Sequence, residues 1–142
     1  MRVGLVSCVK SKLSHPAPAS DLYTSALFRG ARCSVERSCD RWFILSAEHA
    51  LVRPDTVLAP YEKTLKEATP AERRRWSERV LEQLASELGH LGGFTFEVHA
   101  GAAYANFGLV EGLRRTGADV ALPLEGLGLG QRLAFYKRAG CL

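Results

Sequence analysis

Four apolar segments of the sequence are each followed by residues that can take part in catalysis or ligand binding. These residues are Ser7, Cys8, Lys10 and Lys12 after the first segment, Ser46, Glu48 and His49 after the second, His99, Gly101 and Tyr104 after the third, and Gly126 and Gly128 after the fourth. In an open α/β sheet, ligands bind at the carboxyl ends of the strands. The sequence therefore predicts one site, built from four separate parts of the chain.

Carboxylates and imidazoles are the predicted catalytic groups. Glu48 can act as a general acid or base if burial raises its pKa, and Asp55 is a second candidate carboxylate. His49 and His99 can orient a substrate or donate a proton. Neighbours on an extended chain point to opposite sides, so at most one of Glu48 and His49 faces the site. An alternative is that Glu48, His49 and His99 bind a metal, but the spacing lacks an HxH or HExxH framework, and we predict neither metal nor cofactor.

Lys10 and Lys12 are predicted to hold a phosphate as point charges, beside the hydroxyls of Ser7 and Ser11. The spacing of a P-loop is absent. The thiol of Cys8 lies next to this loop, where a cation can make it a nucleophile, although a small buried residue is the simpler interpretation. Arg53 is a further predicted phosphate ligand.

The glycines at 126, 128 and 130 precede the last predicted helix. Such a turn lets backbone N–H groups approach an anion at a helix N-terminus, although tight packing explains it equally well. It does not have the spacing of the dinucleotide-binding fingerprint GxGxxG.

A cluster of arginines lies early in another predicted helix and consists of Arg73, Arg74, Arg75 and Arg79. Cations there oppose the helix dipole, which suggests a patch for a nucleic-acid backbone. The alternative is a solvated face that is neutralised by neighbouring glutamates.

Strands and helices alternate along the chain and must position these residues. We predict strands at residues 3–9, 41–46, 94–99 and 119–124, and helices at 21–35, 70–88, 103–115 and 130–139. Thr69, Pro70 and Glu72 form a capping box at the start of the second helix. Near-continuous apolar strands between helices predict a three-layer α/β domain, with a mostly parallel sheet of about four strands and helices on both faces. The segment 48–66 fits neither element, and a loop of this length is usually functional.

Composition limits the class of protein. The chain has 142 residues and a formal net charge of +4, which predicts one domain over residues 1–142 and is compatible with an anionic partner. No apolar run is long enough for a membrane span or a secretory signal, so we expect a cytoplasmic protein with no membrane contact. The four cysteines form no CxxC pair and are expected to be reduced thiols.

Six segments resemble the small YaaA-related domains of unassigned function. They are 7–12 (SCVKSK), 21–25 (DLYTS), 44–55 (ILSAEHALVRPD), 60–65 (PYEKTL), 100–104 (AGAAY) and 123–130 (PLEGLGLG). The pattern of that family has an aromatic–glycine pair where this chain has His49-Ala50. The resemblance implies an α/β fold, a connection with DNA and peroxide stress, and action on nucleobases or nucleotides.

The residues and the resemblance together predict a protein that handles nucleic acids or nucleotides and has an enzyme-like pocket. If it is an enzyme, we expect a hydrolase of N-glycosidic bonds, similar to a DNA glycosylase, in DNA repair or stress response. Glu48 or Asp55 would meet the oxocarbenium character of the sugar, and Tyr61 or Tyr104 would stack on a flipped base. The alternatives are a non-catalytic DNA-binding stress or defence module and a small-molecule nucleotide hydrolase or transferase. The sequence does not predict the oligomeric state.

Overall fold

A five-stranded sheet forms the centre of the computed structural model, which describes residues 1–8 and 12–142. The strand order is β4-β3-β1-β6-β7, with β1 at Arg2–Ser7, β3 at Arg41–Ser46, β4 at Ala50–Val52, β6 at Thr95–His99 and β7 at Asp119–Ala121. All pairs are parallel except β3 with β4. The predictions for Lys10 and Ser11 lie outside the described residues.

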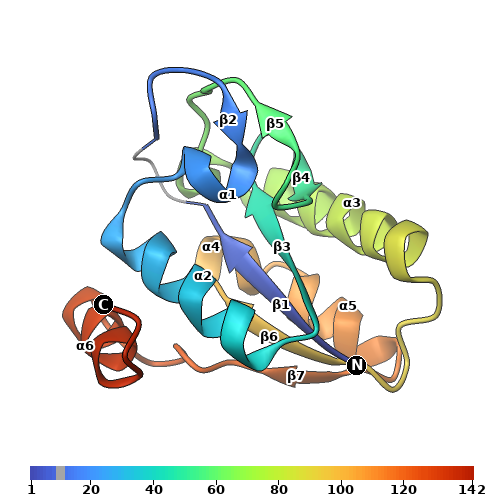
Figure 1. Cartoon of the computed structure of the whole chain (residues 1–142). Coiled ribbons are helices and arrows are strands. Elements are labelled where there is room, and N and C mark those ends of the chain that lie inside the picture. The colour runs from blue at the N-terminus through green and yellow to red at the C-terminus, as the bar shows by residue number, and fades with distance from the viewer. Residues whose placement is uncertain (9–11) are drawn as a thin grey trace.

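Helices cover both faces of this sheet (Figure 1). Helices α2 (Ala26–Ser38) and α6 (Leu129–Arg138) lie on one face, and α3 (Pro70–Leu88), α4 (Ala102–Ala105) and α5 (Leu109–Arg115) lie on the other. Because both faces are covered, the inner strands are apolar almost throughout. The predicted three-layer α/β fold is confirmed, with one antiparallel edge strand more than expected.

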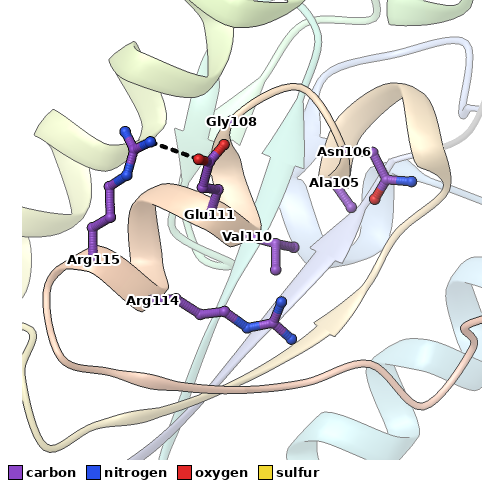
Figure 2. A pocket seen from close by; sticks show the side chains of 7 residues that line it. All are labelled: Ala105, Asn106, Gly108, Val110, Glu111, Arg114 and Arg115. Carbon is purple, nitrogen blue, oxygen red and sulfur yellow. Dashed lines mark hydrogen bonds and ion pairs between the residues drawn. The ribbon is translucent and has the colours of Figure 1, made fainter.

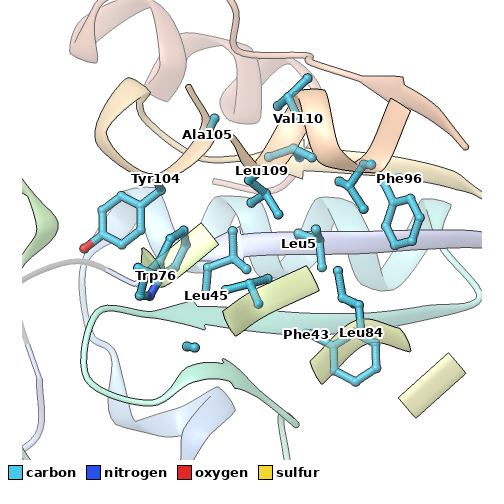
Figure 3. Packing of buried hydrophobic residues seen from close by; sticks show 14 of the residues in the cluster. Leu5, Phe43, Leu45, Trp76, Leu84, Phe96, Tyr104, Ala105, Leu109 and Val110 are labelled. Carbon is cyan, nitrogen blue, oxygen red and sulfur yellow. The ribbon is translucent and has the colours of Figure 1, made fainter. Parts of the chain in front are cut away.

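The larger core lies between the sheet and the helices α3 to α5 (Figure 3). Leu5, Phe43 and Phe96 come from the strands and meet Leu84 of α3 and Leu109 of α5. The rings of Trp76 and Tyr104 pack edge to face at one end of this cluster, with their centres 5.3 Å apart. This packing fixes the position of α4, and with it Tyr104, relative to the carboxyl ends of the strands.

The second core lies between the sheet and the helices α2 and α6. Tyr136 of α6 packs so closely on α2 that a Cβ at Gly30 would lie 2.7 Å from its ring. A disulfide between Cys33 and Cys141, whose Cα atoms are 5.6 Å apart, joins α2 to the chain after α6. The expectation of four reduced thiols is therefore wrong for these two, because two residues distant in the sequence meet at one helix pair. Cys8 and Cys39 are free thiols.

Local signals in the sequence predicted α3 most accurately. The Thr69 side chain accepts a hydrogen bond from the Glu72 N–H, and the Glu72 carboxylate accepts one from the Thr69 N–H, which completes the capping box. Gly89 follows the helix with a positive φ of 75°, a conformation that glycine adopts without strain.

Two predicted helices are each divided in two. Residues 21–35 form α1 (Ala19–Leu22) and α2, because Tyr23 is extended and Ser25 caps a new helix by accepting a hydrogen bond from the Phe28 N–H. Residues 103–115 form α4 and α5, which are separated at Gly108, where φ is 113°. A four-residue period does not reveal such breaks, because both pieces of each helix bury apolar residues.

The segment 48–66 contains more regular structure than predicted. It includes β4, then β5 (Val57–Leu58), which pairs antiparallel with β2 (Ala17–Pro18), and it reaches the short 3-10 helix η1 (Leu65–Glu67). Ala50 has a positive φ of 62° at the turn between β3 and β4. The carboxyl ends of β1 and β3 point toward this segment (Figure 1). Among the described residues, no helix could cross a membrane.

Candidate functional site

Four side chains with hydroxyl or thiol groups meet beyond the carboxyl ends of β1 and β3. The Tyr61 hydroxyl lies 2.7 Å from Ser46 Oγ, is hydrogen-bonded to the Tyr23 hydroxyl, and donates to Cys8 Sγ at 3.6 Å. Ser46 Oγ accepts a hydrogen bond from the His49 N–H at 3.0 Å, which leaves its own proton available for Tyr61. Tyr61 can then donate a hydrogen bond to the sulfur, so the chain of donors ends at the thiol.

Three phenols surround Cys8 and keep their protons at neutral pH. Burial is the largest cause that raises the pKa values of Tyr23, Tyr61 and Tyr104, and Cys8 adds to each of them. The pKa of Tyr104 rises to about 12, although hydrogen bonds with the Thr64 side chain and the Leu65 backbone oppose the rise. These hydroxyls are therefore hydrogen-bond donors rather than bases. We call Cys8, Tyr23, Tyr61 and Tyr104 the thiol–phenol cluster.

A cavity of about 440 Å³ opens onto this cluster. It is lined by Cys8, Lys12, Glu62, Lys63, Thr64, Lys66, Glu67 and Tyr104. Three of the five lysines of the chain are among these residues, and no arginine is. The lining also contains two glutamates, so its net charge is positive but small. Lysine binds phosphate as a point charge, and the lining therefore favours an anionic ligand.

The lining is held in place by contacts outside the cavity. The Lys12 ammonium lies 4.6 Å from the centre of the Tyr61 ring and 5.7 Å from that of Tyr23. On the opposite side, Arg73 donates to the backbone carbonyls of Leu65 (2.8 Å) and Lys66 (3.1 Å), which anchors η1 to α3. The cavity is therefore formed between the first loop and the segment before α3.

The residues that follow β3 lie at or beside the cavity. Ser46 is fully buried within the hydrogen-bonded chain, and the His49 ring contacts the Tyr61 ring edge to face at 5.2 Å. Glu48 is exposed and lies 3.8 Å from Lys63 Nζ. Of the predicted site residues, the structure brings together Cys8, Lys12, Ser46, Tyr61 and Tyr104, with Glu48 and His49 beside them.

Arg53 and Asp55 do not join this group. Arg53 forms a bidentate ion pair with Glu87 of α3, at 2.9 and 2.8 Å, and Asp55 is exposed in the following turn. Strand β4 runs antiparallel to β3 and so carries the chain back toward the amino ends of the parallel strands. The predicted roles of Arg53 and Asp55 assumed that the chain continued outward from β3.

His99 is enclosed in a separate network. Its Nε2 lies 2.7 Å from Glu97 Oε1, its Nδ1 lies 2.7 Å from the Tyr136 hydroxyl, and it is 2 % exposed. Arg2 and Ser38 also donate to Glu97. Burial raises the pKa of Glu97, but the hydrogen bonds from His99, Arg2 and Ser38 outweigh it and bring the pKa down to about 2. Both His99 nitrogens are engaged, so they offer no lone pair to a metal shared with His49, and the described residues contain no metal-binding group of three.

Four further predicted residues lie around α6 rather than the cavity. Ser7 Oγ donates to the His99 carbonyl at 3.4 Å, and Gly101 lies near Arg132. Gly126 is exposed with a positive φ of 76°, and the Gly128 N–H is bound by Gln131 Oε1 at 2.9 Å. The Gln131 carboxamide therefore occupies one of the N–H groups that the glycine turn was predicted to offer to an anion.

The predicted arginine patch is divided by helix geometry. Arg73 is directed to η1, where its guanidinium also lies 4.8 Å from the centre of the Phe107 ring. Arg79 donates to the Glu48 carbonyl at 3.2 Å. Arg74 and Arg75 are exposed, and they alone in this cluster form no hydrogen bond or ion pair with another described residue.

A second hollow of about 470 Å³ lies over α4 and α5 (Figure 2). Its lining includes Asn106, Val110 and Arg114, and an ion pair of 2.6 Å joins Arg115 to Glu111 at its side. None of the predicted catalytic or binding residues that the structure describes lines it.

Sequence reasoning missed most of the cavity lining. No role was predicted for the lining residues Glu62, Lys63, Thr64, Lys66 and Glu67, or for Tyr23 of the thiol–phenol cluster. The lysines were a usable signal in the sequence, because the chain has only five of them and its other cations are arginines. Three of the five line the cavity.

The chain was compared with known proteins. Residues 3–138 match the model of a family described as a family of unknown function, DUF6884. No curated protein and no solved structure matched the sequence. The resemblance to YaaA-related domains and to peroxide-stress proteins remains a prediction.

Proposed function

The chain belongs to DUF6884, a family of unknown function, and we propose that it binds a nucleotide, free or within a nucleic acid, in the lysine-lined cavity. The observation that carries this proposal is the coincidence of three lysines with the thiol–phenol cluster at the carboxyl ends of β1 and β3. This is the edge at which open α/β sheets bind ligands.

Size and chemistry support a ligand of this class. A cavity of about 440 Å³ falls within the range of small-molecule sites. Lys12, Lys63 and Lys66 supply positive charge for a phosphate, and the hydroxyl of Tyr104 offers a donor to a sugar or base. The proposed ligand would place the protein in the cytoplasm, although the Cys33–Cys141 disulfide is more typical of oxidising compartments.

The candidate reaction is hydrolysis of an N-glycosidic bond. In the overall reaction water replaces the base on the anomeric carbon. The carbon–nitrogen bond breaks, the departing base takes up a proton, and a carboxylate stabilises the positive charge that develops on the sugar. Glu62 and Glu67 line the cavity and Glu48 lies beside it, so these carboxylates replace Asp55 as candidates.

A DNA-binding module that uses the arginine patch is less well supported. Two of its four arginines bind backbone carbonyls of the protein itself, and therefore hold the fold together rather than face a phosphate backbone. Arg74 and Arg75 alone give a small basic surface.

Calorimetric titration with a nucleoside monophosphate tests the proposed binding. Lys12→Met should weaken the affinity by about tenfold, as expected for one charged hydrogen bond, whereas Lys137→Met on the exposed face of α6 should leave it unchanged. Inorganic phosphate should bind more weakly than the nucleotide. If the two lysine variants weaken binding equally, or if neither ligand binds the native chain, the proposal fails.

Chromatographic detection of released base tests the reaction separately. Native protein should release free base from a nucleotide or an oligonucleotide, and Glu67→Gln or Glu62→Gln should abolish the release while leaving the binding affinity in place. Binding without any release of base would refute the hydrolase and leave the binding protein.

A further inference from the structure

We propose that Cys8 is the nucleophile of the cavity, a thiol that forms a covalent bond with a carbon electrophile on an anionic ligand. The reactivity of the thiol stands independently of the proposed function. The identification of the natural electrophile as a nucleotide rests on that function.

The thiol is reached from the cavity. Cys8 is 5 % exposed, yet it is one of the residues that line the cavity of about 440 Å³. Its backbone N–H donates to the Leu45 carbonyl at 3.0 Å, which extends the pairing of β1 with β3 by one residue. The sulfur is therefore held rigidly at the end of a strand, as a reacting group must be.

Hydroxyl donors face the sulfur. Tyr61 donates to Sγ at 3.6 Å, and Tyr104 lines the same cavity beside it. Because burial raises the pKa values of these phenols, they remain donors at neutral pH. These hydroxyls can donate hydrogen bonds to the sulfur, which is the atom with which cysteine attacks carbon.

The charges around Cys8 select the ligand. Lys12, Lys63 and Lys66 line the cavity together with Glu62 and Glu67. The lysines outnumber the glutamates, so the net charge of the lining is positive and attracts an electrophile that carries a negative group. The other free thiol lies beside a carboxylate, and that carboxylate is paired with Arg2. Cys39 is partly exposed and lies 3.7 Å from Glu97 Oε2, and its pKa is raised by burial and by that carboxylate.

The chemistry is substitution at carbon. The thiolate forms a carbon–sulfur bond while the bond from carbon to the leaving group breaks, and the leaving group departs with the electron pair. With a nucleotide, the leaving group is the base, which takes up a proton. Water then attacks the same carbon and the carbon–sulfur bond breaks, so that the thiol is regenerated without an oxidant or a reductant.

Two alkylating probes of similar size and different charge test the proposal on the native chain. Iodoacetate is anionic and iodoacetamide is neutral, and mass spectrometry of peptides gives the rate at each free cysteine. We expect iodoacetate to modify Cys8 about fivefold faster than Cys39, although Cys39 is the more exposed of the two. We also expect the rate ratio of iodoacetate to iodoacetamide to be higher at Cys8 than at Cys39.

Variants separate the contribution of the Tyr61 hydroxyl from that of the lysine charge. Tyr61→Phe should slow alkylation of Cys8 by about threefold because one donor is lost. Lys66→Met should lower the preference of Cys8 for iodoacetate, whereas Lys137→Met should not. The rate at Cys39 reports on the fold in each variant, because unfolding would expose both thiols.

Two results would overturn the proposal. One is modification of Cys8 by iodoacetate that is no faster than that of Cys39. The other is an equal preference for the anionic probe at both sites. Protection of Cys8 by a nucleoside monophosphate is a separate measurement. A fast, charge-selective Cys8 that the nucleotide does not protect would support the nucleophile and contradict the proposed ligand.

Discussion

Glu97 is a buried carboxylate whose replacement should change the pH dependence of stability. Its side chain is 8 % exposed and accepts hydrogen bonds from Arg2, His99 and Ser38. Although burial raises its pKa, these bonds lower it from the ordinary 4.5 to about 2. The folded state therefore favours the charged carboxylate, and Glu97→Gln removes that preference without a large change in volume.

The magnitude follows from the pKa difference. One pKa unit corresponds to about 1.4 kcal/mol, so the carboxylate contributes about 3 kcal/mol to the free energy of unfolding when it is fully charged. A lowered pKa in the folded state gives stability that is present above pH 4.5 and is lost as the pH falls through about 2. The free energy of unfolding of the native protein minus that of Glu97→Gln should then be about 2 kcal/mol smaller at pH 3 than at pH 6.

Urea denaturation of both proteins across this pH range measures the gap. Other carboxylates, such as Glu72 and Glu87, also have lowered pKa values. They contribute equally to both proteins, so their contribution cancels when the two free energies of unfolding are subtracted. A gap that stays constant from pH 6 to pH 3 would refute the assignment of a charged, hydrogen-bonded Glu97.

Three further predictions concern the framework of the site. Cys141→Ser should lower the free energy of unfolding by about 4 kcal/mol through loss of the long disulfide loop, and an equal urea midpoint with and without reductant would contradict this. Thr69→Ala should cost about 1 kcal/mol by removing the capping box of α3, whereas the same change at exposed Thr56 should cost much less. Ala50→Val should destabilise by about 2 kcal/mol or more in thermal unfolding, because a β-branched side chain is strained at the positive φ of this buried position, and a neutral effect would contradict that conformation.

The layered fold was accessible from the sequence because its signals are local. Apolar runs mark β1, β3 and β6, and the capping box marks the first turn of α3. The parallel order of the strands brings Cys8 and Ser46 to one edge of the sheet, as strand direction alone predicts.

The remaining parts of the site depend on contacts that periodicity does not encode. Strand β4 is three residues long and reverses the chain, so Arg53 was assigned to the wrong end of the sheet. His99 lies on the side of β6 that Tyr136 covers, and only the packing of α6 reveals this. The cavity lining at 62–67 consists of a loop and the short helix η1, which is held by Arg73 from another element, and no spacing rule identifies it.

A structure of the protein bound to a nucleoside monophosphate tests the central claim most directly. The account predicts the phosphate within ion-pair distance of Lys12, Lys63 or Lys66, and the sugar or base against Tyr104 and Cys8. A nucleotide bound at the α4–α5 hollow or at the glycine turn before α6, with the lysine-lined cavity unaffected, would contradict it.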